Sequence, residues 1–378
     1  MEEINSKLTL IPLGSTITLF TVLLSFFAWS FLVTVILTPL FRKLSFKLGI
    51  LDKPTEARKI HKKPVALLGG VVIFLVFQIA LISLWFIFPL ERAKLASIFV
   101  GGTILMITGL IDDIRPLTAR AKLFWQVLAS TLAAFLLIGS DIKISGYLEQ
   151  FEMGIPLAYV ITILWIIGIT NSFNLLDNMD GLATGIAFIC SMTFGVIALM
   201  QAEVFTALLA FSLSGACMGF IHFNWNPASI FMGDAGSMFV GFIVATISIM
   251  GVYRRLSEVQ YIPILAPLIV LAVPMFDTLS VIIIRLKNRI SIFSADKNHF
   301  SHRLVNLGMT TRQAVGFNYL VCFAMGLMGI LVTTLTRHQA TIIIFLTVSV
   351  FMIIVFLMNV SDKQLKTIQE NHKNNNHN

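Results

Sequence analysis

The sequence predicts an all-α, polytopic membrane protein with about eleven transmembrane helices. Of its 378 residues, 57% are hydrophobic and only 12% are charged, whereas soluble domains carry about 25% charged residues. Several apolar stretches run for roughly 18 to 24 residues, which is enough for a helix to cross a hydrocarbon core of about 30 Å. These stretches are continuous and do not alternate, which argues against an outer-membrane β-barrel.

The spans can be placed in order along the chain. A short segment, 1–16, precedes a first span that is too long and too late for an ordinary signal peptide. The spans form one membrane domain, 17–359, and the polar tail 360–378 is expected to be disordered. The expected spans are 17–41, 67–90, 95–111, 121–139, 156–170, 181–200, 205–222, 236–253, 262–286, 313–335 and 340–359.

Lys and Arg residues set the expected orientation. One set of connections holds 20 of the 27 Lys and Arg residues, and the positive-inside rule places it in the cytoplasm, with the N-terminus outside and the C-terminus inside. The net charge of +8 is mostly this topology signal; it suits anionic headgroups or substrates and does not indicate nucleic acid. The cytoplasmic set comprises 42–66, 112–122, 171–180, 223–235, 285–312 and the tail.

Acidic and amide residues gather in these cytoplasmic connections. Asp112 and Asp113 end the third span, and adjacent carboxylates repel unless a cation or proton lies nearby. They are candidates for a metal ligand or general base beside phosphate-binding cations. The structural alternative is a charged helix end paired with Arg115, Arg120 and Lys122.

The run 171–180 is the most specific of these patches. Asn171, Asn174, Asp177 and Asp180 recur every three residues, with no Lys or Arg among them. In a regular α-helix this spacing drifts by about 60° per step, so we expect a broken helix end that serves two neighbouring subsites. The alternative is a polar turn that Gly181 caps.

Asp234 lies where the eighth span begins, after the helix-breaking residues Pro227 and Gly233. It is either an N-cap or an oxygen ligand for Mg²⁺, which prefers one or two carboxylates plus substrate phosphates. Phe231, just before it, is a candidate for stacking on a base, although packing explains such a ring equally well. Asp277 lies within the ninth span, where Arg285 is a candidate partner.

Two basic segments complete the set of candidates. His299, His302 and Arg303 have a spacing that fits one helical face and can donate to phosphate or sugar oxygens; a two-histidine transition-metal site is the alternative. Lys59 and His61, in the first cytoplasmic loop, are candidates for substrate binding, and positive-inside anchoring explains them as well.

Five motifs occur in order: RKIHKKPVALLGG, GLIDDI followed by LTARAKLFWQ, NSFNLLDNMDGLATG, FMGDAGS and ADKNHFSHRL. Together they resemble the polyprenyl-phosphate N-acetylhexosamine-1-phosphate transferases, the WecA and TagO type of glycosyltransferase family 4, which are relatives of MraY. The resemblance covers residues 17 to 330. It implies transfer of N-acetylglucosamine 1-phosphate, or a related N-acetylhexosamine 1-phosphate, from a UDP-sugar to undecaprenyl phosphate. The products are a polyprenyl diphosphate-sugar and UMP, and the reaction initiates cell-envelope polysaccharide synthesis.

The resemblance also implies a setting and a cofactor. It implies a bacterial cytoplasmic (inner) membrane with the active site on cytoplasmic loops, Mg²⁺ with Mn²⁺ as the alternative ion, and a homodimer as one oligomeric state. We predict direct attack by the lipid phosphate on the β-phosphorus, with UMP leaving; the alternative is a two-step route through an aspartyl-phosphate on Asp113 or Asp112.

The implied roles fall on the residues already singled out. The metal ligands are Asp234 with Asn174, and the catalytic acids are Asp112 and Asp113. The expected substrate-binding residues are Lys122 for the diphosphate, Asp177, Asp180 and Gly181 with Asn171 for the nucleoside, Phe231 for uracil, His299, His302 and Arg303 for the diphosphate and sugar, and Lys59 with His61.

Departures from the family pattern leave alternatives open. Ala295 and Ser301 replace a proline and a middle histidine in the histidine segment, so the sugar is not fixed by the sequence. An MraY-like phospho-N-acetylmuramoyl-pentapeptide transferase is one alternative, although its triple-histidine loop is not found. An ion-coupled transporter is the alternative from another class, with acids in broken helices binding cations.

Overall fold

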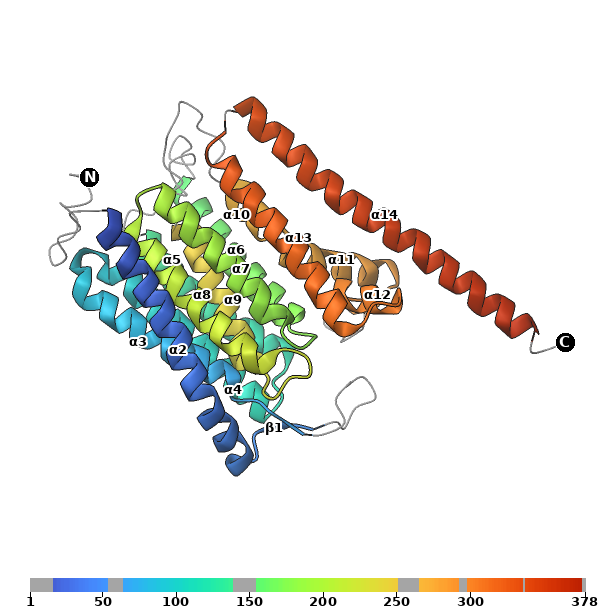
Figure 1. Cartoon of the computed structure of the whole chain (residues 1–378), viewed down its shortest axis with the longest axis horizontal. Coiled ribbons are helices and arrows are strands. Elements are labelled where there is room, and N and C mark those ends of the chain that lie inside the picture. Colours follow the sequence, from blue (N-terminus) through green and yellow to red (C-terminus); the bar gives the residue numbers. More distant parts are fainter. Residues whose placement is uncertain are drawn as a thin grey trace.

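The computed structural model describes residues 16–53, 64–138, 154–250, 265–291, 298–335 and 337–375. Within these ranges the protein is a bundle of long apolar helices (Figure 1), ten of which are long and apolar enough to cross a membrane. The prediction of an all-α polytopic membrane protein is therefore confirmed. The direction in which the helices cross the membrane stays a prediction.

The helices follow the predicted order. The long ones are α2 (Thr16–Leu48), α3 (Gly69–Ile87), α4 (Arg92–Ile114), α5 (Ala119–Ile138), α6 (Gly154–Leu176), α7 (Leu182–Met200), α8 (Val204–Asn224), α9 (Gly233–Met250), α13 (Thr311–Val332) and α14 (Arg337–Asn375). The shorter elements are the 3₁₀ turn η1 (Pro89–Glu91), α10 (Leu265–Val270), α11 (Ala272–Lys287), α12 (Phe300–Asn306) and an antiparallel pair of strands, β1 (Leu51–Asp52) and β2 (Val65–Ala66).

The ninth expected span, 262–286, is not one continuous helix. Its described part forms α10 and α11, which meet at Leu271. Pro274 favours the break, because it has no N–H to donate to the carbonyl of Val270 and fits well in the first turn of a new helix. The sequence therefore predicted one more uninterrupted span than the described residues contain.

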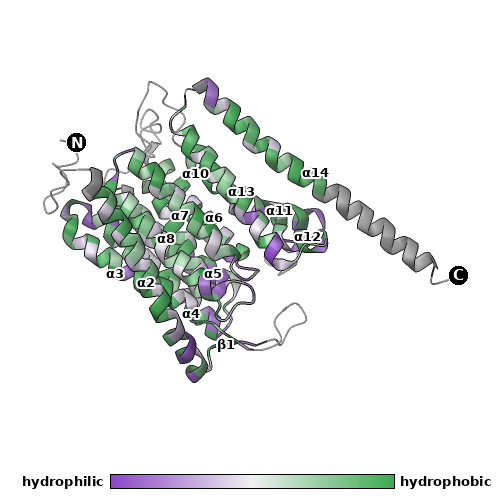
Figure 2. Ribbon diagram, viewed as in Figure 1, coloured by the Kyte–Doolittle hydropathy of each residue, from purple (hydrophilic) through white to green (hydrophobic). Residues whose placement is uncertain are grey.

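α9 lies at the centre of the bundle. In its most apolar stretch 89% of the residues are buried, compared with 17% for α2 and α14. α9 packs against α4, α6, α3 and α7. The outer helices turn large apolar side chains such as Phe86, Phe135 and Leu164 outward, and Figure 2 shows apolar residues along the whole length of the bundle. These outward faces are suited to lipid.

The C-terminal segment includes one long helix, and the disorder expected of the tail stays a prediction. α14 continues to Asn375 as a long helix that extends away from the bundle (Figure 1). No Gly or Pro follows Arg337 to stop it, and most of the polar residues after the apolar stretch are compatible with a helix.

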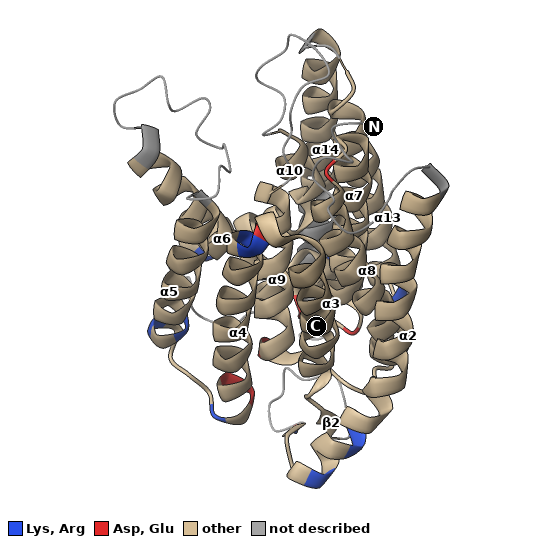
Figure 3. Cartoon of the chain, turned by 90° about the vertical axis from the view of Figure 1, so that its left-hand side faces the viewer, with Lys and Arg blue, Asp and Glu red and all other residues tan. Residues whose placement is uncertain are grey.

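One end of the bundle collects the helix ends that matter for function. Lys and Arg residues at the C-terminal end of α2 lie at the same end as the loop joining α4 to α5 (Figure 3). The C-terminus of α4, the N-terminus of α5, the C-terminus of α6 and the N-terminus of α9 meet there. The candidate residues on these four helix ends are thereby brought together.

Candidate functional site

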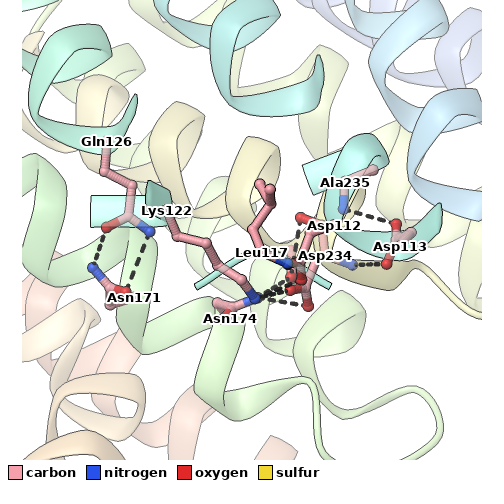
Figure 4. A network of polar contacts seen from close by, with 10 residues as sticks. Asp112, Asp113, Leu117, Lys122, Gln126, Asn171, Asn174, Asp234 and Ala235 are labelled. Carbon is pink, nitrogen blue, oxygen red and sulfur yellow. Dashed lines mark hydrogen bonds and ion pairs between the residues drawn. The ribbon is translucent and has the colours of Figure 1, made fainter. Parts of the chain in front are cut away.

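Asp234, in the first turn of α9, is the centre of a polar network built from four helices (Figure 4). The Nζ atom of Lys122 lies 2.5 Å from Oδ2 of Asp234. The amide of Asn174 donates to the other oxygen, Oδ1, at 3.0 Å and also to the hydroxyl of Ser237 at 2.9 Å. Asn174 thus orients the Asp234 carboxylate through its NH₂ group, in addition to any ligand role.

Asp112 shares the ammonium group of Lys122 with Asp234. Its Oδ2 lies 2.5 Å from Nζ of Lys122, and its Oδ1 accepts the N–H of Leu117 at 2.6 Å. The second bond ties the carboxylate to the loop between α4 and α5. One cation therefore contacts carboxylates from α4 and α9, which offsets part of the repulsion expected of this acidic cluster.

Asp113 does a different job from its neighbour. Its Oδ1 accepts the N–H of Asp234 at 2.8 Å, and its Oδ2 accepts the N–H of Ala235 at 3.1 Å. These are unsatisfied donors at the start of α9, so Asp113 caps that helix from α4. Gly233 has a φ of 69°, and a Cβ there would lie 2.5 Å from Oδ2 of Asp113. The turn therefore requires glycine.

Small residues allow the surrounding helices to approach the start of α9. A Cβ on Gly70 would lie 2.2 Å from the nitrogen of Gly236, and one on Gly109 would lie 2.4 Å from the nitrogen of Ala235. α3 and α4 therefore contact the α9 backbone directly. The position of Asp234 is fixed by main-chain packing as well as by hydrogen bonds.

The run 171–180 is irregular only in its second half. α6 remains helical to Leu176, and a turn follows. Asn171 and Asn174 lie three residues apart on this helix and bond to different partners. Asn171 pairs with the amide of Gln126 at 2.7 and 3.3 Å, unlike Asn174. The expectation of a broken helix end was thus wrong for these two asparagines and holds for the residues after Leu176.

The turn after α6 contacts a second region, the segment that follows α8. Oδ2 of Asp180 accepts the amide of Asn226 at 2.9 Å and the N–H of Ala228 at 3.0 Å. The N–H of Gly181 donates to Oδ1 of the buried Asn224 at 3.1 Å. These bonds fix the turn to the segment that follows α8, and they use one of the two carboxylate oxygens of Asp180.

Asp177 lies between these two groups. Its carboxyl group has no hydrogen-bond partner among the residues that the structure describes, in contrast to Asp180. Burial, followed by the negative charges of Asp234 and Asp180, raises the pKa of Asp177 from an ordinary 3.8 to about 8. A cation bound nearby would lower this pKa and release the proton.

The histidine segment adjoins the same turn. Ser301, the first-turn residue of α12 that replaces the family's middle histidine, donates to Oδ1 of Asn178 at 2.7 Å. The rings of His299 and His302 lie 6.3 Å apart, and His302 and Arg303 are partly exposed. Asp277 contacts His299 at 2.8 Å, whereas Arg285 was the partner that the sequence suggested.

Phe231 is held by its backbone at the entrance to α9. Its N–H donates to the carbonyl of Ala66 at 2.8 Å, and its carbonyl accepts the N–H of Gly69 at 3.1 Å. The residue is partly exposed. Lys59 and His61 lie outside the described residues.

A divalent cation fits this donor set. The described residues contain no group of three or more His, Cys, Asp or Glu side chains that could hold a metal. However, Asp112 and Asp234 already converge on one cation, the ammonium of Lys122. Mg²⁺ commonly uses one or two carboxylates and takes its other oxygens from substrate phosphates and water. Asp234 and Asp112 are the residues that would hold it, with Asp177 as a neighbouring carboxyl.

Several contributors could not be recognised from the sequence alone. Four residues hydrogen-bond to residues of the site and so help to position them: Gln126, Asn178, Asn224 and Tyr319. The hydroxyl of Tyr319, for example, donates to the carbonyl of Gly181 at 2.5 Å. Their only signal was a polar side chain in or beside an apolar span, which is shared by many residues that play no such part.

Comparison with known protein sequences identifies relatives of this chain. The profile of "Glycosyl transferase family 4" matches residues 95–252. A "Probable undecaprenyl-phosphate N-acetylglucosaminyl 1-phosphate transferase" of Bacillus subtilis (strain 168) is 32% identical over 92% of this chain and 95% of its own length. An "Undecaprenyl-phosphate alpha-N-acetylglucosaminyl 1-phosphate transferase" of Yersinia pestis is 27% identical over 78% of this chain and 80% of its own.

A further relative carries a different sugar in its name. A "Phospho-N-acetylmuramoyl-pentapeptide-transferase" of Listeria monocytogenes serotype 4b (strain CLIP80459) is 34% identical, over 60% of this chain and 75% of its own length. The alignment with the Bacillus subtilis relative extends over nearly the whole of both chains. The chain therefore belongs to glycosyl transferase family 4, with the polyprenyl-phosphate N-acetylglucosamine-1-phosphate transferases of the WecA and TagO type.

Proposed function

We propose that this multi-pass membrane enzyme transfers N-acetylglucosamine 1-phosphate from UDP-N-acetylglucosamine to undecaprenyl phosphate. The products are the lipid diphosphate-sugar and UMP. In this proposal the reaction takes place at the cytoplasmic face of a bacterial inner membrane and is the first step in making a cell-envelope polysaccharide. The Bacillus subtilis and Yersinia pestis relatives, which align with 92% and 78% of this chain, are named for this transfer.

One structural observation carries the proposal. Asp112, Lys122, Asn174 and Asp234 come from four different helices and meet at one end of the bundle. Both substrates are phosphate anions, and one of them is anchored in the membrane. A site with carboxylates for a cation and a lysine for phosphate, at the end of apolar helices, suits a reaction between a soluble and a lipid-borne phosphate.

The residues suggest distinct tasks in the transfer. Lys122 can move from its two carboxylates to the diphosphate of the UDP-sugar and neutralise developing charge on the leaving UMP. Mg²⁺, when bound at Asp234 and Asp112, would supply further charge neutralisation at the diphosphate. Asp234 is held for that purpose by Asn174 and, through its backbone, by Asp113.

Asp112 is the better candidate for contact with the lipid phosphate. Both oxygens of Asp113 accept main-chain N–H groups, so a chemical step on Asp113 would release the start of α9. Asp112 makes only one main-chain bond, and its other oxygen faces Lys122. In direct attack, this favours Asp112 as the group that deprotonates or orients the lipid phosphate. In a two-step route, it favours Asp112 as the nucleophile.

The two alternatives are weaker. The pentapeptide transferase relative aligns with a shorter part of this chain, 60% compared with 92%. An ion-coupled transporter would need acids near the middle of the membrane, whereas Asp112, Asp177 and Asp234 lie at helix ends.

Transfer of label tests the proposal. Membranes that contain the protein would be incubated with short-chain polyprenyl phosphate, Mg²⁺ and UDP-N-acetylglucosamine labelled in the sugar, and labelled lipid and UMP would be measured. We expect both products, and neither after chelation or with Asp234→Ala. Glu91→Ala is the matched control, because this acid pairs with Lys94 at 2.7 Å at the opposite end of α4. Transfer only from another UDP-sugar would revise the donor, and no transfer from any would refute the proposal.

A further inference from the structure

The carboxyl group of Asp277, on α11, lies inside the protein. The residue is 1% exposed. A carboxylate within an apolar bundle is costly and is normally held by a defined partner. Both of its oxygens have one, because Oδ2 lies 2.8 Å from Nδ1 of His299, and Oδ1 accepts the N–H of Phe300 at 2.6 Å. Asp277 therefore bonds to the start of the histidine segment at two points, the ring of His299 and the backbone N–H of Phe300.

The first contact determines which nitrogen of His299 carries the proton. A carboxylate beside Nδ1 accepts a hydrogen bond from it, so a neutral His299 ring keeps its proton on Nδ1 and leaves Nε2 as an acceptor. A protonated ring donates from Nε2. Nε2 has no hydrogen-bond partner among the described residues. It is also absent from the set of fully buried, unpartnered polar atoms in these residues. Nε2 is thus the ring nitrogen that no described residue uses, on a side chain that is 5% exposed.

The position of α12 places this nitrogen near the proposed substrate. Ser301, two residues after His299, bonds to Asn178 in the turn that also contains Asp177 and Asp180. The ring of His302 lies 6.3 Å from that of His299. In the proposed function, a diphosphate or sugar bound beside this turn would offer oxygen partners to Nε2 of His299.

We propose that Asp277 is a positioning residue for the transfer reaction. It fixes the orientation of His299 and keeps the proton of the neutral ring on Nδ1, so that Nε2 accepts a hydrogen bond from a sugar hydroxyl of the UDP-sugar; a protonated ring would instead donate from Nε2 to a diphosphate oxygen. The inference deepens the proposed function and rests on it. The competing explanation is purely structural: Asp277 holds α12 through Phe300, and His299 only fills space.

Asp277→Asn separates the two explanations. The amide oxygen can still accept the N–H of Phe300, so the anchor of α12 is kept. The amide NH₂ then faces Nδ1 of His299 and forces that nitrogen to accept, which moves the proton to Nε2. We expect kcat for labelled-lipid formation to fall roughly 10- to 100-fold, as when the partner that orients a functional histidine is lost, while melting temperature in detergent stays close to wild type.

A double-mutant cycle with His299→Gln measures whether the effect of Asp277→Asn on kcat depends on the His299 ring, which a purely structural role of Asp277 would not require. If Asp277 acts through the ring, adding Asp277→Asn to His299→Gln changes kcat by less than about twofold. Ser280→Ala is the matched control on α11, because its hydroxyl donates only to the main-chain carbonyl of Asp277 at 2.8 Å; we expect wild-type activity. Asp277→Glu retains the carboxylate and is expected to be more active than Asp277→Asn.

Each result has a defined meaning. Absence of transfer by the wild-type protein in the same membranes counts against the proposed function. Wild-type transfer with an unaffected Asp277→Asn, or equal losses in the wild-type and His299→Gln backgrounds, overturns only the inference. If Asp277→Asn does not accumulate in the membrane, Asp277→Glu and its cycle with His299→Gln take its place, and additive losses there overturn the inference.

Discussion

Replacing Asp113 with asparagine tests the division of labour between the two adjacent acids. Asp113 accepts two main-chain N–H groups from the start of α9, one on each oxygen. Asparagine has only one acceptor oxygen, so one of these bonds is lost and an NH₂ group faces a donor. A hydrogen bond to a charged group contributes about 1.5–3 kcal/mol, which corresponds to roughly 10- to 150-fold in an equilibrium.

The loss should appear in the binding of Mg²⁺, because the displaced backbone carries Asp234. We expect the Mg²⁺ concentration for half-maximal UMP release to rise within that range for Asp113→Asn, with a lower melting temperature in detergent. Asp112→Asn should also raise this concentration, since Asp112 would hold the metal, but it should in addition lower kcat at saturating Mg²⁺. Its melting temperature should change less, since Asp112 makes a single main-chain bond, to Leu117. Initial rates at a series of Mg²⁺ concentrations measure both. An Asp113→Asn protein with wild-type Mg²⁺ dependence and stability would refute the reasoning.

Three further predictions follow from other contacts. Because the pKa of Asp177 is raised to about 8 in the folded protein, folding stability should fall as pH rises from about 4 to about 8, and Asp177→Asn should remove this loss. The gain in melting temperature of the variant over wild type should therefore be larger at pH 8.5 than at pH 5; an equal gain at both pH values would contradict the prediction. Ser301→Ala and Asn178→Ala should each raise KM for the UDP-sugar about 2- to 13-fold, the value of one ordinary hydrogen bond, with no further rise in the double variant; additive effects would argue against the link. Gly109→Ala should abolish accumulation of folded protein, since its Cβ would lie 2.4 Å from the α9 backbone, whereas Gly168→Ala, with nothing within 4 Å, should behave as wild type in size-exclusion profiles.

Hydropathy predicted the spans well because each long helix must cross the same thickness of hydrocarbon. The break in the ninth span was visible in principle from Pro274, but Pro is often tolerated in membrane helices, so its presence alone did not decide the matter. The spacing of Asn171 and Asn174 suggested irregular backbone. The helix instead stays regular, because different neighbours, Gln126 and Asp234, satisfy the two amides.

The grouping of the acids was predictable from the sequence, whereas their individual partners were not. Asp112 and Asp113 are identical in type and adjacent, and only the three-dimensional contacts distinguish a carboxylate that faces Lys122 from one that caps α9. Similarly, Arg285 was the nearby candidate for Asp277, whereas the actual partner, His299, is 22 residues away in the sequence. Tertiary packing decides such pairings, and local spacing carries no information about them.

The cap on α9 has a consequence for inhibitors. The N-terminus of a helix is a common site for phosphate and sulfate, because its free N–H groups and its dipole attract anions. In this protein Asp113 already occupies the N–H groups of Asp234 and Ala235, and the nitrogen of Gly236 is packed against Gly70. In the proposed reaction the start of α9 therefore leaves the diphosphate to side chains and to the proposed metal ion, and simple oxyanions that bind at exposed helix ends in other enzymes should compete poorly with the UDP-sugar here.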